Sequence, residues 1–188
     1  MAKSNALLGL ALSLAFLSIA GATYSTRAAS AGAAQSVDAF DLQILEKRGL
    51  AIPVKGVAAK ELRDNFAEGR AKRHHEAIDI LAPRGTPVIA TGDGRVVKLF
   101  TSLAGGITVY QFDPDERFAY YYAHLDRYAE GLVEGSMLKR GELVGYVGTS
   151  GNAPKNTPHL HFAIFRLGPE KRWWKGAPVN PYPFLAAR

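Results

Sequence analysis

The feature of this sequence that most constrains its fold is a series of short extended segments separated by glycine-containing turns. The series fills most of the chain beyond residue 75, and Gly92-Asp93-Gly94 is typical of its turns. Branched and aromatic residues favour strands in these segments, namely at Ala77–Leu81, Pro87–Thr91, Arg95–Thr101, Ile107–Phe112, Phe118–His124, Leu143–Val147 and His159–Phe165. Many short strands at regular spacing predict an all-β fold, a mainly antiparallel sandwich or barrel.

Two candidate helices precede the strands. The segment Asp38–Arg48 has Ser36 or Asp38 near its start and Gly49 at its end, which are typical signals of helix termini. A second short helix is expected at Lys60–Phe66, where apolar residues repeat at a spacing of four. We therefore expect one or two short N-terminal helices beside the β structure.

The N-terminal segment resembles a targeting sequence. An apolar run follows Lys3, and small residues follow the run, so residues 1–22 are predicted to be a cleaved signal peptide. The alternative is an inner-membrane anchor formed by residues 6–24, which carry no charge. Residues 23–37 are rich in Ala and Ser and are expected to be a linker. The working domain, residues 38–188, would then lie outside the cytoplasm, in the periplasm or cell envelope.

Composition limits the chemistry of any site. The chain has no cysteine, which excludes disulfides, a thiol nucleophile and thiolate metal ligands. Any metal must therefore be held by nitrogen and oxygen. The formal net charge is +6, which fits an acidic polymer as partner, but the cationic residues are scattered and predict no nucleic-acid site.

The five histidines lie in three short segments. Residues two or four apart on a strand share a face, so His159 is expected beside His161, and His75 beside Asp79. Together His75, Asp79 and His161 offer two imidazoles and one carboxylate. This is the ligand count of a catalytic zinc site, in which a fourth position is left for water.

Glu76 resembles a catalytic base, because the sequence from His75 to Asp79 imitates the start of a His-Glu-x-x-His motif. In that motif a glutamate on a helix activates the zinc-bound water. Here Ile78 and Pro83 favour a short strand over a helix. On a strand Glu76 is expected to face away from His75 and Asp79, which excludes it as the base.

Three separated motifs resemble those of the lysostaphin/LytM-type zinc endopeptidases, which act on the peptide part of peptidoglycan. They are His75-x-x-x-Asp79, Tyr122-Ala123-His124-Leu125 and Pro158-His159-Leu160-His161-Phe162. Their order and spacing match the family, and the similarity runs from about Ile52 to about Leu185.

The resemblance implies one zinc ion per chain, with His75, Asp79 and His161 as ligands and His124 and His159 as the catalytic pair. It also implies the lysostaphin-type (duplicated-hybrid-motif) β-sandwich, with an open groove over the metal.

Two positions depart from the family's pattern. Ala77 replaces a glycine, and Ala163 stands where a glutamate often follows the second histidine of His-x-His. Neither departure removes a ligand, so the site is expected to be active. Further contacts with substrate are expected from His74, Tyr122, Asn152 and Asn156.

These observations predict an exported zinc metalloendopeptidase that hydrolyses stem peptides or cross-links of peptidoglycan. Two other functions remain open. One is a non-catalytic module of the same fold that binds the wall or activates other hydrolases, and the other is a metallopeptidase for exported proteins or peptides. Peptidoglycan is the expected partner, and the membrane is a partner only if residues 6–24 are retained.

Overall fold

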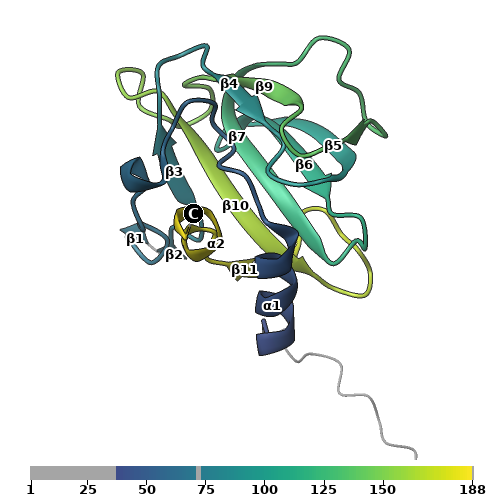
Figure 1. Cartoon of the computed structure of the whole chain (residues 1–188). Coiled ribbons are helices and arrows are strands. Elements are labelled where there is room, and N and C mark those ends of the chain that lie inside the picture. Colours follow the sequence, from purple (N-terminus) through teal and green to yellow (C-terminus); the bar gives the residue numbers. More distant parts are fainter. Residues whose placement is uncertain (1–36, 71–72, 188) are drawn as a thin grey trace, which may run out of the picture. The chain divides into compact units, whose positions relative to one another are not determined.

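An antiparallel sheet of nine strands dominates the computed structural model, which describes residues 37–70 and 73–187 (Figure 1). Its main path runs in the spatial order β11 (Gly176–Val179), β10 (His159–Leu167), β7 (Phe118–Tyr128), β6 (Gly106–Phe112), β5 (Gly94–Ser102) and β8 (Met137–Leu138). Off this path, β3 pairs with β10, and β9 pairs with both β7 and β4; their bounds are β3 (Ile78–Leu81), β4 (Pro87–Ile89) and β9 (Leu143–Val147). The predicted all-β, mainly antiparallel fold is confirmed.

All of the predicted strands exist within a few residues of their expected bounds, but four short strands were missed. They are β8, β11, β1 (Gly69–Arg70) and β2 (Arg73–His74), and the last two form a separate two-stranded sheet. Each is too short or too polar to carry an alternating hydrophobic pattern, which is why the sequence did not indicate them.

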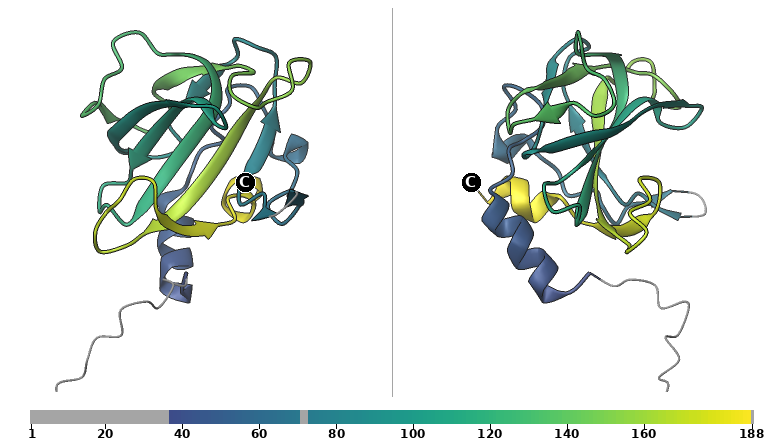
Figure 2. Two further views of the ribbon diagram at one scale, coloured as in Figure 1. Left: turned by 180° about the vertical axis from the view of Figure 1, so that it is seen from behind. Right: turned by 90° about the vertical axis from the view of Figure 1, so that its right-hand side faces the viewer.

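Register shifts bend the sheet. They interrupt the pairing of β4 with β9, β5 with β6, β6 with β7 and β7 with β9. Such bulges increase strand twist, and Figure 2 shows a sheet that curls strongly instead of lying flat.

The two faces of the sheet differ in burial. Leu160, Phe162 and Ile164 alternate along β10 and are fully buried in the main core, with Tyr120 and Tyr122 of β7. The residues between them on β10 belong to the opposite face, where both site histidines of this strand lie.

The first predicted helix is confirmed as α1 (Ala39–Arg48). Asp38 caps it by accepting a hydrogen bond from the Asp41 N–H at 2.8 Å, and Gly49 ends it in the left-handed conformation with φ of 62°. Ser36, the other candidate cap, lies outside the described residues.

The second predicted helix, at Lys60–Phe66, is wrong. Only a 3₁₀ turn, η1 (Ala59–Glu61), forms there, and the chain becomes extended at Leu62. The Leu62 side chain is buried in the core, so tertiary packing overrides the local helical pattern. A short helix that was not predicted, α2 (Tyr182–Ala186), lies near the C-terminus.

The predicted signal peptide, residues 1–22, and all but the last residue of the predicted linker lie outside the described residues. Within the described part of the chain, every helix is too short or too polar to traverse a bilayer.

Candidate metal centre and active site

Three donor atoms converge on the open face of the sheet. His75 Nε2, Asp79 Oδ1 and His161 Nδ1 form a triangle in which each pair of atoms is 3.0 Å apart. The register of the sheet produces this arrangement, because His161 of β10 lies directly opposite Asp79 of β3. His75 reaches the same point from the segment just before β3.

The triangle fits a zinc ion. Tetrahedral zinc with bonds of about 2.0–2.1 Å to nitrogen and oxygen holds its ligand atoms about 3.4 Å apart, so the three atoms need to separate by only a few tenths of an ångström. Burial raises the pKa of Asp79, but hydrogen bonds from His161 and His75 outweigh burial and lower that pKa well below its usual range. The carboxylate is therefore ionised and suited to a cation.

Asn65 supports two of the three donors. Its backbone carbonyl accepts a hydrogen bond from His75 Nδ1 at 3.0 Å, which directs Nε2 of this ring toward the cluster. Its side-chain oxygen accepts from the Asp79 N–H at 3.2 Å. Asn65 was not predicted, because a lone asparagine in an expected helix carries no sequence signal of this role.

His124 and His159 lie beside the donor cluster. The His124 ring is centred 5.0 Å from that of His159 and 5.5 Å from that of His161, and His159 Nε2 is 3.8 Å from Asp79 Oδ1. Nδ1 of His124 donates to the Ser150 carbonyl at 2.9 Å, and Nδ1 of His159 donates to the Thr157 carbonyl at 2.8 Å. In this tautomer each ring keeps a basic Nε2.

The charge state of His124 follows from its surroundings. Burial, and then the positive charge of His161 and His159, lowers the pKa of His124 to about 4. Near neutral pH its imidazole is therefore uncharged and able to accept a proton.

The backbone of His124 explains why this side chain reaches the site. Its φ is 60°, in the left-handed region, and its N–H donates to the Gly105 carbonyl at 2.8 Å. The pairing of β6 with β7 shifts register here, from Val109 opposite Tyr122 to Ile107 opposite Leu125. Simple alternation would place Tyr122 and His124 on one face, and this irregularity breaks that alternation.

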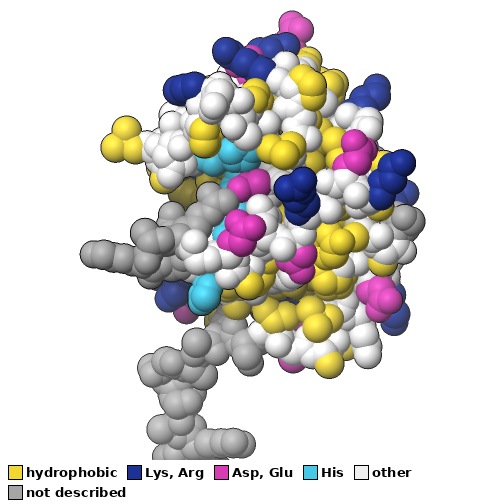
Figure 3. Space-filling view, turned by 90° about the vertical axis from the view of Figure 1, so that its left-hand side faces the viewer, with side chains coloured by type: hydrophobic (Ala, Val, Ile, Leu, Met, Phe, Trp, Pro, Cys, Tyr) yellow, Lys and Arg dark blue, Asp and Glu magenta, His cyan; other side chains and the backbone are white. Residues whose placement is uncertain are grey.

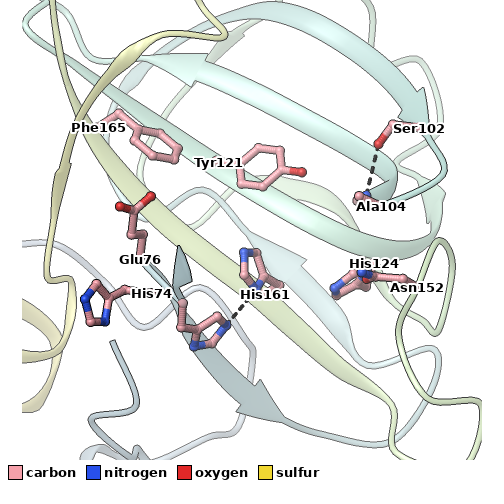
Figure 4. A pocket seen from close by; sticks show the side chains of 11 residues that line it. His74, Glu76, Ser102, Ala104, Tyr121, His124, Asn152, His161 and Phe165 are labelled. Carbon is pink, nitrogen blue, oxygen red and sulfur yellow. Dashed lines mark hydrogen bonds between the residues drawn. The ribbon is translucent and has the colours of Figure 1, made fainter. Parts of the chain in front are cut away.

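The site lies in a pocket of about 490 Å³ (Figure 4). Its lining includes His75, His124 and His161, with side chains from β7, β10 and the β5–β6 turn around them. Histidine side chains are also visible among acidic ones on the molecular face in Figure 3.

The expected substrate contacts are only partly supported. His74 and Asn152 line the pocket. Tyr122 does not, because it is fully buried and its hydroxyl donates to Gln111 Oε1 at 2.8 Å, so this expectation is wrong. Its neighbour Tyr121 lines the pocket instead. Asn156 is exposed and lies outside the pocket lining.

The expected orientation of Glu76 is also wrong. The strand begins only at Ile78, and Glu76 has a left-handed φ of 56°. Its side chain lines the same pocket as His75 instead of facing away. In Figure 4 the carboxylate nevertheless points toward Phe165 and away from His161.

An antiparallel β fold that brings three N/O donors and two further histidines together at one site defines a candidate single-metal hydrolytic centre. Residues 73–181, more than half of the 188 residues, match peptidase family M23, and the chain belongs to this family. The resemblance to the lysostaphin/LytM-type endopeptidases is thereby confirmed.

Three similar proteins illustrate the range of the family. The L-Ala–D-Glu endopeptidase of Bacillus subtilis (strain 168) is 33% identical over 121 residues, which are 62% of this chain and 36% of that protein. The murein hydrolase activator NlpD of Salmonella dublin is 29% identical over 125 residues, 66% and 29% of the two proteins. The structure of the antimicrobial peptidase lysostaphin from Staphylococcus simulans is 25% identical, with a TM-score of 0.54 over 68% of this chain and 49% of that one.

The match thus spans about a third of the length of these curated relatives.

Proposed function

We propose that this chain is a zinc-dependent endopeptidase that hydrolyses peptide bonds of peptidoglycan. The observation that carries the proposal is the triangle of His75 Nε2, Asp79 Oδ1 and His161 Nδ1, with the rings of His124 and His159 beside it. A metal site that only stabilises the fold would need no more than these three donor atoms. Hydrolysis also needs groups that transfer protons and stabilise charge.

Zinc is the metal that suits this donor set. Two imidazoles and one carboxylate form a common set for catalytic zinc, and the chain has no cysteine to favour a softer ion. When bound, zinc supplies Lewis acidity, which makes water nucleophilic near neutral pH and polarises a peptide carbonyl.

His124 and His159 would transfer the proton and stabilise the developing negative charge. Nε2 of either His124 or His159 accepts the proton of the attacking water and passes it to the departing amine. The other ring, in the doubly protonated form that also carries a hydrogen on Nε2, donates a hydrogen bond to the oxygen that gains negative charge at the carbonyl. The hydrogen bonds to Ser150 and Thr157 fix both rings for these roles and reduce the reorganisation that the reaction requires.

The substrate class rests on the relatives. The B. subtilis protein is named as an L-Ala–D-Glu endopeptidase, and NlpD as a murein hydrolase activator. For this chain we propose peptidoglycan as substrate and export to the periplasm or cell envelope, consistent with the apolar run after Lys3.

Digestion of purified sacculi tests the proposal. The zinc-loaded protein should release soluble fragments, and mass spectrometry of new peptide termini would identify the bond that is cut. A variant with both His124 and His159 changed to Ala, at equal zinc content, is the control. If the parent protein releases no more peptide than this control, the proposed activity is wrong.

The alternative of a hydrolase activator has one observation in its favour, the 29% identity to NlpD. The intact donor triangle argues against it, since activation of another enzyme does not require a metal site. The same digestion separates the two functions, because an activator would release fragments only when a second hydrolase is added.

A further inference from the structure

The backbone at Glu76 adopts a conformation that disfavours side chains. Among the described residues only four non-glycine residues have positive φ, and two of them, Glu76 and His124, line the candidate active-site pocket. The left-handed conformation costs free energy in any residue with a Cβ atom, and such strain concentrates at functional sites.

Neighbouring hydrogen bonds hold this conformation. The His75 N–H donates to the Glu68 carbonyl at 2.9 Å, and the Glu76 N–H donates to the Phe66 carbonyl at 3.0 Å. These bonds fix the backbone that leads into Glu76, whose side chain lines the pocket.

The carboxylate of Glu76 is exposed in that wall. Within residues 37–70 and 73–187 it makes no hydrogen bond or ion pair with another described residue. It points toward Phe165 (Figure 4). Unlike Asp79, it is therefore not occupied in holding the donor cluster.

Two half-buried aromatic rings lie in the same part of the pocket. The rings of Phe165 and Tyr121 are centred 6.4 Å apart, and the Tyr121 ring is centred 6.1 Å from the ring of His161. Both line the pocket with Glu76. A carboxylate next to aromatic rings is a favourable environment for a cation, because the ring faces and the carboxylate both attract positive charge.

We propose that Glu76, with Phe165 and Tyr121, forms a subsite for a protonated primary amine of the substrate. Glu76 directly follows His75 in the chain and lines the same pocket, so the amine lies close to the bond held at the donor cluster. A single exposed carboxylate supplies too few oxygen ligands for a second metal ion. Glu76 is thus a specificity residue, and this inference rests on the proposed peptidase function.

Two kinds of amine share this chemistry, the side-chain amine of a diamino acid and a free N-terminal amine. Three synthetic peptides that contain the cleaved bond distinguish them. One carries only the free side-chain amine, one carries only the free N-terminal amine, and one is acetylated at both. Cleavage of each is measured at low ionic strength with zinc-loaded parent protein and with Glu76→Gln at equal zinc content.

Glu116→Gln is the matched control. Glu116 is also a glutamate with positive φ, 50°, but it pairs with Arg95 and does not line the pocket. Its substitution removes the same charge from a similarly strained backbone, so it separates a local effect of Glu76 from a general effect of charge.

The parent protein should cleave one amine-bearing peptide about five- to tenfold more efficiently than the acetylated peptide, as expected for one charge-assisted contact at a partly exposed site. Glu76→Gln should abolish this preference through a higher KM, and Glu116→Gln should retain it. Equal cleavage of all three peptides by the parent protein would overturn the subsite. So would a fall in cleavage efficiency in Glu76→Gln that is the same for all three peptides.

A binding measurement keeps this test separate from the activity. Calorimetry with the metal-free parent protein reports whether the amine-bearing peptide binds more tightly than the acetylated one. A preference in binding without cleavage of any peptide contradicts the proposed peptidase but supports the subsite. Cleavage without any preference contradicts the subsite alone.

Discussion

At the scale of single residues, the site separates into atoms that could hold a metal and rings that could transfer protons. His75, Asp79 and His161 present three atoms to one point. His124 and His159 lie at the edge of this cluster, each with its Nδ1 bonded to a backbone carbonyl. Substitution in the first group should therefore remove the metal, whereas substitution in the second should lower turnover and leave the metal bound.

We expect His124→Ala and His159→Ala to keep their zinc and to lose turnover by about 10²-fold or more, the effect of removing acid–base or oxyanion groups. Metal analysis and sacculus digestion on the same samples check this. His74→Ala is the comparison, because it also removes an imidazole from the pocket lining, but one whose Nδ1 contacts the Ala67 carbonyl at 3.2 Å. His74 is expected only to contact substrate, so this variant should retain its kcat. Parent-like rates for both catalytic variants would contradict the mechanism.

Ser150 should position His124. Its carbonyl accepts from His124 Nδ1, while its hydroxyl accepts from the Ile107 N–H at 2.9 Å and donates to the Leu125 carbonyl at 2.6 Å. Ser150→Ala removes both hydroxyl bonds and should lower kcat by about tenfold, because displacement of about 1 Å suffices to impair a catalytic group. Zinc content should not change.

Ser136→Ala is the matched control for this prediction. The Ser136 hydroxyl accepts from the Val133 N–H at 3.1 Å in a turn that does not line the pocket. A kcat loss as large in Ser136→Ala as in Ser150→Ala would indicate a general effect of the substitution on folding.

At the scale of elements, strand pairing explains which parts of the site could be predicted. The residues of His159-Leu160-His161 alternate on β10, and β3 lies in register with that strand. Strand alternation therefore predicted the shared face of His161 and Asp79, which contact each other at 3.0 Å, while their role as zinc ligands stays a prediction. Asn65 and Ser150 could not be found, because they act through backbone carbonyls on loops whose position depends on the folded chain.

Tyr122 shows a second limit of sequence patterns. Alternation separates Tyr121 from Tyr122, but it does not say which of them faces the core. The answer depends on the irregular residue His124, whose left-handed backbone restarts the alternation of β7. Only the folded sheet reveals such a break.

The helix α1 is attached to the sheet by a buried carboxylate. Asp41 is 1% exposed and accepts hydrogen bonds from Arg117 Nε at 2.6 Å and from Arg166 Nε at 2.9 Å. Burial raises the pKa of Asp41, but the hydrogen bonds, first that from Arg117, outweigh burial and lower it. Arg166 belongs to β10, the strand that carries His159 and His161.

We expect Asp41→Asn to lower the free energy of unfolding by about 2 kcal/mol, less than for a fully buried pair because the two arginines are partly exposed. This corresponds to a fall in Tm of about 4–8 °C, measurable by calorimetry. Because the folded-state pKa is lowered, the contribution of Asp41 is present above its unfolded pKa and is lost as the pH falls below it. The difference between parent and variant should therefore shrink in acid.

Asp115→Asn serves as the control, because Asp115 also pairs with an arginine, Arg48, but its side chain is 72% exposed. Exposed pairs contribute about 1 kcal/mol or less. Equal destabilisation by the two substitutions would show that burial of Asp41 is not the cause.

At the scale of the whole molecule, the two faces of the curled sheet have different roles. One face buries the main core, and the other carries the candidate catalytic pocket. The family match covers residues 73–181, so α1 and the segment that supplies Asn65 lie outside it. Because Asn65 contacts two of the donors, this preceding segment is part of the proposed site.

The central claim is that hydrolysis depends on one zinc ion held by His75, Asp79 and His161. The most direct measurement removes the metal with a chelator, returns zinc in known amounts and follows sacculus digestion. Activity should vanish on removal and return fully at one zinc per chain, while His161→Ala, matched in protein concentration, should bind little zinc and remain inactive. Digestion that persists in metal-free protein, or stoichiometric zinc in both His161→Ala and Asp79→Ala, would contradict the claim.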